Sequence, residues 1–145
     1  MNKATCRALR ERVGLSQSDV AKLAGVTVDS VKNWENPKRP SAYPDDVIEE
    51  LSRMLSGMRA RAEEAADMVA DEFAGAKTVT MTYWRTQAEH DALAADGAFF
   101  GHVNAQSRLC ADMLERRGFE VAFAYPEEPG PAQLANIKHR MDRGR

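Results

Sequence analysis

The segment Leu15–Pro40 constrains the fold most, because its capping residues predict two short helices joined by a tight turn. Ser16 can cap the first helix, and Asp19 three residues later makes an acidic variant of the capping box. Gly25 follows, and glycine can take the positive φ that a sharp link between two helices needs. Thr27 can then cap the second helix. The predicted helices cover about 16–24 and 27–36.

Each of these two helices has an apolar side that can pack inward. The inner side of the first helix consists of Val20, Ala21 and Leu23. In the second helix, Val31 and Trp34 lie three residues apart and share one face, and we expect Trp34 to be a core residue. The opposite side of the second helix carries Val28, Asp29, Lys32 and Asn33. Side chains in that position are free to meet base edges in a DNA major groove.

The residues of this free side differ in the bases they suit. Asn33 suits adenine, and Lys32 can reach guanine or a phosphate. Asp29 is acidic on a surface that must approach DNA, and it has two interpretations. Its carboxylate can accept a hydrogen bond from cytosine N4, or it can support Lys32 three residues later in the helix.

Several positions of the same segment agree with a known pattern, and the resemblance covers roughly residues 4–55. These positions are Gln17, Ala21, Gly25, Val31, the Trp34-Glu35 pair and Lys38-Arg39-Pro40. On them the segment resembles the Cro/C1-type (XRE) helix-turn-helix domains of phage repressors and bacterial regulators. The resemblance implies a lambda-repressor-like bundle that binds double-stranded DNA.

The resemblance also implies roles for individual residues. Base contacts are expected from Val28, Asp29, Lys32 and Asn33. Phosphate contacts are expected from Gln17, Thr27, Lys38 and Arg39. Arg10 and Glu35 are expected to form a structural pair. One position departs from the family, because Pro37 stands where a glycine usually follows the second helix. Proline cannot take the left-handed cap, so the exit loop is predicted to run differently.

The net charge of −2 is unevenly distributed along the 145 residues. Residues 1–43 carry a charge of +4, residues 44–76 carry −6, and residues 77–145 are neutral. The positive field thus coincides with the segment expected to meet phosphates, and the acidic middle should face away from DNA.

A long apolar stripe follows, after a helix start at Pro44-Asp45-Asp46. It comprises Val47, Leu51, Leu55, Met58, Ala62, Ala65, Val69 and Phe73. One interpretation is a single long helix that links two modules and contributes to a dimer seam. The alternative is two helices with a break near Ser56-Gly57, each packed within its own chain.

The C-terminal part, 77–126, is predicted to be a small strand-helix-helix-strand unit. Strands are expected at about 78–84 and 119–125, with helices at about 86–95 and 102–117 between them. Two strands alone are marginal in water, and a homodimer that joins two such units into one sheet would solve that problem. The charged tail, 127–145, can hold a short basic helix from Gln133 to Arg140 or stay disordered.

The layout also resembles a narrower group, the anti-CRISPR-associated autorepressors of the second class. The resemblance rests on Trp34-Glu35, on the helix start Tyr43-Pro44-Asp45-Asp46-Val47, and on a later strand, helix and strand unit. It implies a homodimer that binds an inverted repeat in its own promoter. The expected fold class is mainly α with a small α+β part. The expected domains are a DNA-binding domain at 1–55, whose last helix continues to about 75, a dimerisation domain at 77–126, and the tail.

Other chemistry finds little support in the sequence. His90, His102 and His139 lack metal-ligand spacing, so no metal, cofactor or enzymatic site is expected. Cys6 and Cys110 are interpreted as reduced cytosolic thiols, and no membrane segment or secretory signal is present. The aromatic residues Tyr83, Trp84, Phe99, Phe100 and Phe119 could line a ligand pocket but more often form a core or dimer interface.

The sequence thus predicts a cytoplasmic, homodimeric DNA-binding repressor. Two alternatives remain open: an antitoxin that neutralises a toxin partner, and a regulator that senses a small ligand.

Overall fold

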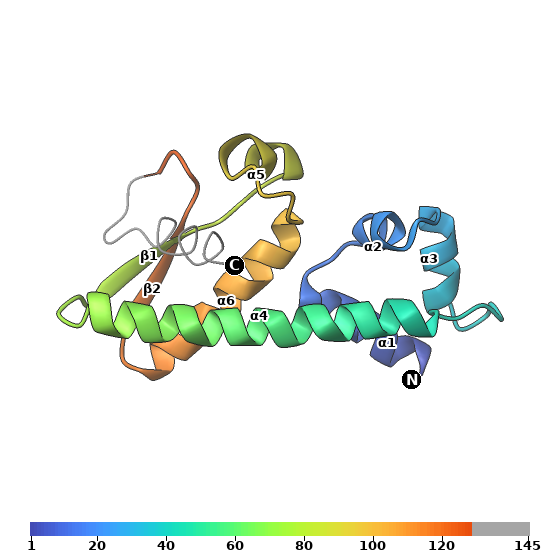
Figure 1. Ribbon diagram of the computed structural model, residues 1–145, viewed down its shortest axis with the longest axis horizontal. Coiled ribbons are helices and arrows are strands. Elements are labelled where there is room, and N and C mark those ends of the chain that lie inside the picture. The colour runs from blue at the N-terminus through green and yellow to red at the C-terminus, as the bar shows by residue number, and fades with distance from the viewer. Residues whose placement is uncertain (129–145) are drawn as a thin grey trace. The chain divides into compact units, whose positions relative to one another are not determined.

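The computed structural model describes residues 1–128, which are mainly helical with one two-stranded sheet. The predicted fold class, mainly α with a small α+β part, is confirmed. The elements are α1 (Lys3–Val13), α2 (Gln17–Ala24), α3 (Val28–Glu35), α4 (Asp45–Glu72), β1 (Thr78–Thr82), α5 (Gln87–Leu93), α6 (Phe100–Arg116) and β2 (Glu120–Ala124). The chain divides into two compact units, residues 1–58 and a second that starts at Arg59, and α4 belongs to both (Figure 1). The short basic helix predicted at Gln133 to Arg140 lies outside the described residues.

Local capping explains where the helices of the first unit begin and end. Ser16 accepts a hydrogen bond from the backbone N–H of Asp19 (3.0 Å), and Asp19 accepts one from the N–H of Ser16 (3.0 Å), so the predicted capping box is confirmed. Gly25 ends α2 with φ of 68°, a conformation that a side chain with Cβ rarely adopts. Thr27 caps α3 through the N–H of Ser30 (3.2 Å), again as predicted.

The core of the first unit is built from α1, α2, α3 and the first turns of α4. Its buried apolar residues are Cys6, Leu9, Val13, Leu15, Val20, Ala21, Val31, Trp34, Tyr43, Val47, Leu51, Leu55 and Met58. The prediction for Leu23 is wrong, because 36% of this residue is exposed. Leu23 lies about 200° around the helix from Ala21, so it lies at the edge of the side that Val20 and Ala21 bury.

The helix α4 is continuous over 28 residues, so the interpretation as a single long helix is confirmed and the alternative, a break near Ser56-Gly57, is wrong. Its buried residues repeat every three or four positions from Val47 to Val69, as the stripe predicted. Ala66 is fully buried where the stripe was assigned to Ala65, which is only half-buried. The stripe is covered by the chain itself and is therefore not an exposed dimer seam.

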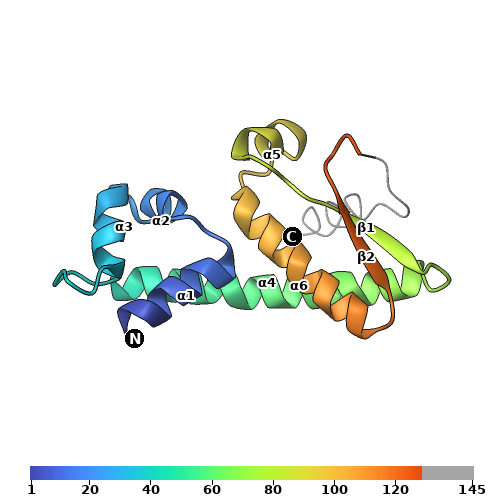
Figure 2. The same ribbon diagram turned by 180° about the vertical axis from the view of Figure 1, so that it is seen from behind.

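The second unit has the predicted order of strand, helix, helix and strand. β1 and β2 pair in parallel, with Val79 opposite Val121 and Met81 opposite Phe123 (Figures 1 and 2). A parallel pair needs a long crossover, which α5 and α6 supply. The core beneath the sheet is Ala62, Ala66, Val69, Val79, Met81, Cys110, Ala111 and Leu114. The buried part of α4 thus packs with one face of β1 and with α6.

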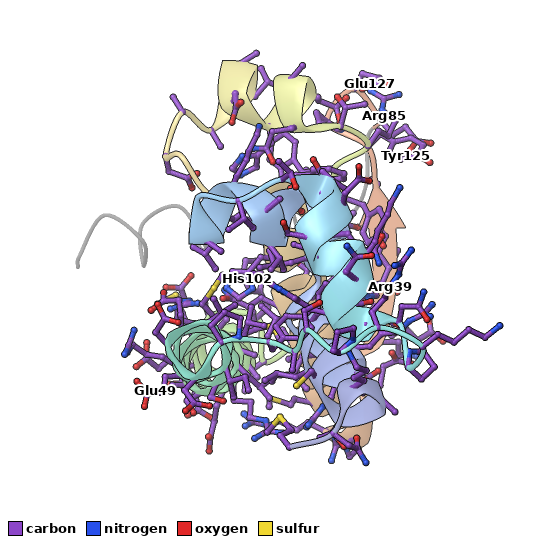
Figure 3. All side chains as sticks on the ribbon, turned by 90° about the vertical axis from the view of Figure 1, so that its right-hand side faces the viewer. Arg39, Glu49, Arg85, His102, Tyr125 and Glu127 are labelled. Carbon is purple, nitrogen blue, oxygen red and sulfur yellow. The ribbon has the colours of Figure 1, made fainter. Side chains whose placement is uncertain are left out.

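The carboxyl ends of the two strands are tied together by Arg85. Its guanidinium lies 4.4 Å from the ring centroid of Tyr125 and pairs with Glu127 at 2.6 Å (Figure 3). It also forms an ion pair with Glu89 in α5. Because Arg85 follows β1 and Tyr125 follows β2, these contacts hold the ends of both strands in register.

One hydroxyl in β1 is buried and has no hydrogen-bond partner among the described residues, and we expect its removal to stabilise the protein. Thr80 is 1% exposed, and its Oγ1 makes no hydrogen bond within residues 1–128. A buried unpaired hydroxyl costs free energy that an isosteric methyl does not. Thr80→Val should therefore raise the free energy of unfolding by about 1 kcal/mol, measured by denaturant titration.

The matched control for this substitution is Thr78→Val. Thr78 is in the same strand, and its hydroxyl donates a hydrogen bond to Glu120 (3.3 Å). That substitution should leave the free energy of unfolding unchanged or slightly lower it. Destabilisation by Thr80→Val would show that the hydroxyl has a partner after all.

Candidate nucleic-acid interface

The helix α3 presents a polar face whose side chains make no polar contact with the rest of the part that the structure describes. Asp29, Lys32 and Asn33 are exposed, and Val28 at the first position of the helix is half-buried. The side chains of the three polar residues form no hydrogen bond or ion pair with another described residue. Asp29, Lys32 and Asn33 lie on the side opposite the buried Val31 and Trp34, and Val28 lies at the edge of that side. The structure therefore leaves the four predicted base-contacting residues together and available.

The buried side of α3 is fixed to α1 by an ion pair. The structure brings Arg10 and Glu35 together: Arg10 Nε donates to Glu35 Oε2 at 2.7 Å, and Nη2 donates to Oε1 at 2.9 Å. Arg10 Nη1 also donates to the carbonyl of Leu15 at 3.0 Å. Only 10% of the Arg10 side chain and 4% of the Glu35 side chain are exposed. This bidentate contact sets the position of α3 against α1.

Two further side chains donate to the Glu35 carboxylate. Gln17 Nε2 donates to Oε1 at 3.2 Å, and the Tyr43 hydroxyl donates to Oε2. Burial raises the pKa of Glu35, but the hydrogen bonds from Arg10, Tyr43 and Gln17 and the charge of Arg10 outweigh it, so the pKa lies below its ordinary value. Burial, followed by the bond to Glu35, raises the pKa of Tyr43, which keeps its hydroxyl protonated.

Gln17 and Thr27, both predicted to contact phosphate, begin helices. Gln17 is the first residue of α2 and is half-buried, with one side-chain N–H directed to Glu35. Thr27 is exposed before α3, and its Oγ1 is occupied with Ser30. Helix N-termini offer backbone N–H groups to anions.

The loop that leaves α3 carries the other two predicted phosphate ligands, Lys38 and Arg39, both exposed. Asn36 caps α3 in an extended conformation (φ −84°, ψ 116°), as expected for a residue that precedes proline. Its Oδ1 accepts from the N–H of Lys38 (3.0 Å), and its carbonyl accepts from the N–H of Arg39 (3.1 Å). The loop therefore begins with a turn that Asn36 stabilises.

Sequence reasoning missed Lys3, which contacts this region from α1. Its Nζ donates to the carbonyls of Asn33 (3.2 Å), Trp34 (2.9 Å) and Ser41. No local signal could have found it, because a lysine in a first helical turn is usually a solvated side chain.

Comparison with known families shows to which protein family the chain belongs. The sequence matches the model of the Aca2/YdiL-like family over residues 1–118, which is most of the chain. The chain belongs to this family. It is the family of anti-CRISPR-associated regulators, so the narrower of the two resemblances is confirmed. A search of curated proteins found no match.

Membership of this family makes the chain a regulatory, DNA-binding protein, and the family is not one of enzymes. The match ends within the turn after α6, so it includes the whole of the α3 face and the exit loop. Among residues 1–128, no helix is both long and apolar enough to cross a bilayer.

Proposed function

We propose that the chain is a homodimeric repressor that binds an inverted repeat in its own promoter. The observation that carries the proposal is the face of α3, where Asp29, Lys32 and Asn33 are exposed and pair with no side chain of residues 1–128, while the other side of the same helix is fixed by Arg10 and Glu35. A rigidly held helix with a free polar face suits reading of base edges in a major groove.

Two such helices in a dimer would enter successive major grooves about one helical turn, ~34 Å, apart. A bound dimer would then block polymerase by occupying the promoter. The phosphate contacts of Gln17, Thr27, Lys38 and Arg39 would set the position on the duplex, and Val28, Asp29, Lys32 and Asn33 would supply sequence specificity.

The second unit supports the dimer. Its sheet has two strands within the described residues, and β2 places Phe123 at its surface with 42% of the residue exposed. An apolar edge strand of this kind is a ready template for pairing with another chain. We propose that the β2 edges of two protomers meet and form one larger sheet.

The proposal is tested by fluorescence anisotropy of the full chain on its own upstream DNA and on a scrambled duplex, at several salt concentrations. Strong preference for the upstream DNA, with two protomers per site, supports it. Equal and steeply salt-dependent binding to both duplexes would contradict it, and would direct attention to a toxin or a small ligand bound by the second unit.

Substitutions in the interface should separate specificity from affinity. Lys38→Ala should weaken binding to all sequences alike and lower the slope of log affinity against log salt by about one, because one phosphate contact is lost. Asn33→Ala should cost about 1–3 kcal/mol on the upstream DNA and relax the choice at one base pair. Anisotropy on a set of single-base-pair variants of the operator measures both effects.

The two substitutions serve as controls for each other, since both shorten an exposed side chain of the same unit. Equal losses from both on every duplex would contradict this division between phosphate and base contacts.

A further inference from the structure

The C-terminus of α3 has backbone carbonyls that need hydrogen-bond donors from outside the helix. The last carbonyls of a helix have no partner within the helix, and a glycine in the left-handed conformation usually allows the following backbone to cap them. Here Asn36 is extended and Pro37 follows, so this end of α3 has no residue in the left-handed conformation. The N–H of Asn36 donates to the carbonyl of Asn33 at 3.2 Å, and further donors to this end of the helix must come from outside it.

The ammonium group of Lys3 meets this need from α1. Its three donors match three acceptors, which are the carbonyls of Asn33 and Trp34 in the last turn of α3 and that of Ser41 in the exit loop. The positive charge also lies at the negative end of the helix dipole. Lys3 therefore replaces the missing glycine cap and joins helix and loop in one contact.

The same loop is held at its far end by Tyr43, whose hydroxyl donates to Glu35. The loop is thus tied to α3 through Tyr43 and to both α1 and α3 through Lys3, and the exposed Lys38 and Arg39 lie between these anchor points. Without the Lys3 contact, the turn made by Asn36 would be the remaining restraint on the first half of the loop.

We propose that Lys3 is a positioning residue for DNA binding. It fixes the exit loop against the C-terminus of α3, so that Lys38 and Arg39 meet phosphates at a set distance from the base-reading face. The proposal rests on the proposed function, since it concerns the same interface. Lys3 acts through the backbone of α3 and the loop, and its own charge is not a phosphate ligand because its donors are occupied within the chain.

The first test uses the free protein and needs no DNA. Hydrogen exchange is measured for wild type, Lys3→Met and Arg12→Met. Arg12 is the matched control, because it is an exposed cation of the same helix whose side chain makes no hydrogen bond or ion pair with residues 1–128. Lys3→Met should speed amide exchange in residues 36–43 by about tenfold or more, and Arg12→Met should leave it unchanged. Unchanged exchange in Lys3→Met would overturn the proposal.

The second test measures the salt dependence of binding to the upstream duplex. Lys3→Met should weaken binding about tenfold and lower the salt slope by about one to two, because the loop phosphate contacts become loose. Lys3→Arg keeps the charge, but its planar fork cannot reach three converging carbonyls, so it should remain defective. Full recovery by Lys3→Arg, or an equal loss from Arg12→Met, would show that charge alone matters and overturn the proposal.

The two tests distinguish failure of this inference from failure of the proposed function. If wild type shows no preference for its upstream DNA, the repressor proposal fails, and the exchange experiment alone decides whether Lys3 orders the loop. Should Lys3→Met fold poorly, Lys3→Gln retains two donors and should give an intermediate exchange rate at residues 36–43.

Discussion

Glu35→Gln should lower the free energy of unfolding by about 3–5 kcal/mol, the largest effect on stability that we expect from one substitution. The neutral amide has almost the same shape, but it leaves the charge of Arg10 buried without a counter-charge. It also brings an N–H group toward donors from Arg10, Tyr43 and Gln17, all of which now point at a carboxylate. Denaturant titration near neutral pH measures the loss, and the α3 face should lose affinity for DNA with it.

The control for this substitution is Glu11→Gln. Glu11 also pairs with an arginine, Arg7 at 2.7 Å, but 55% of its side chain is exposed. Exposed pairs contribute about 0.2–1 kcal/mol at most, so the control should change little. Equal and small effects of both substitutions would show that the buried pair does not hold the helix.

The same pair predicts a dependence on pH. The pKa of Glu35 is lower in the folded chain than its ordinary value, so its contribution to stability is present above about pH 4.3, the ordinary pKa of a glutamate. That contribution is lost as pH falls through the lowered pKa of the folded state. Glu35→Gln cannot titrate at this position, so the difference between wild type and variant should shrink as pH falls from 5 to 2.

The helices of the first unit could be predicted from the sequence because the interactions that define them are local. Ser16 reaches Asp19 and Thr27 reaches Ser30, each three residues along the chain, and the N–H of Gly25 donates to carbonyls within the preceding turn of α2. The apolar periodicity of α4 is likewise a local pattern. Such signals are read directly from neighbouring residues.

The interactions that complete the site could not be predicted in the same way. Lys3 lies 31 residues from Trp34, and the Tyr43 hydroxyl reaches Glu35 across a loop whose course Pro37 makes unusual. Parallel pairing of β1 with β2 depends on a crossover of two helices, which no residue of either strand encodes. Leu23 shows the remaining difficulty, because its exposure depends on which side of a short helix the rest of the chain covers.

Phe123→Lys should convert the proposed homodimer into monomers. Phe123 is in β2, and its ring touches that of Tyr83 (centroids 5.4 Å apart), yet 42% of the residue is exposed. Lysine on an edge strand opposes pairing with another strand. Separate monomers lose the advantage of binding two half-sites at once, so affinity for the operator should fall by a factor of about 10²–10⁴. Sedimentation equilibrium measures the dimer, and anisotropy measures the operator affinity.

The matched control is Leu93→Lys, which adds the same charge at an apolar residue of the second unit that is 64% exposed. Leu93 ends α5 and does not belong to the sheet, so this variant should remain dimeric and bind the operator like wild type. Phe123→Ala separates the effect of lost apolar area from the effect of added charge. It removes apolar area without adding charge, and should weaken the dimer less than Phe123→Lys does. A dimer that survives Phe123→Lys, with the thermal unfolding of the variant unchanged, would rule out pairing through β2 and leave the two DNA-reading faces to be joined by another surface.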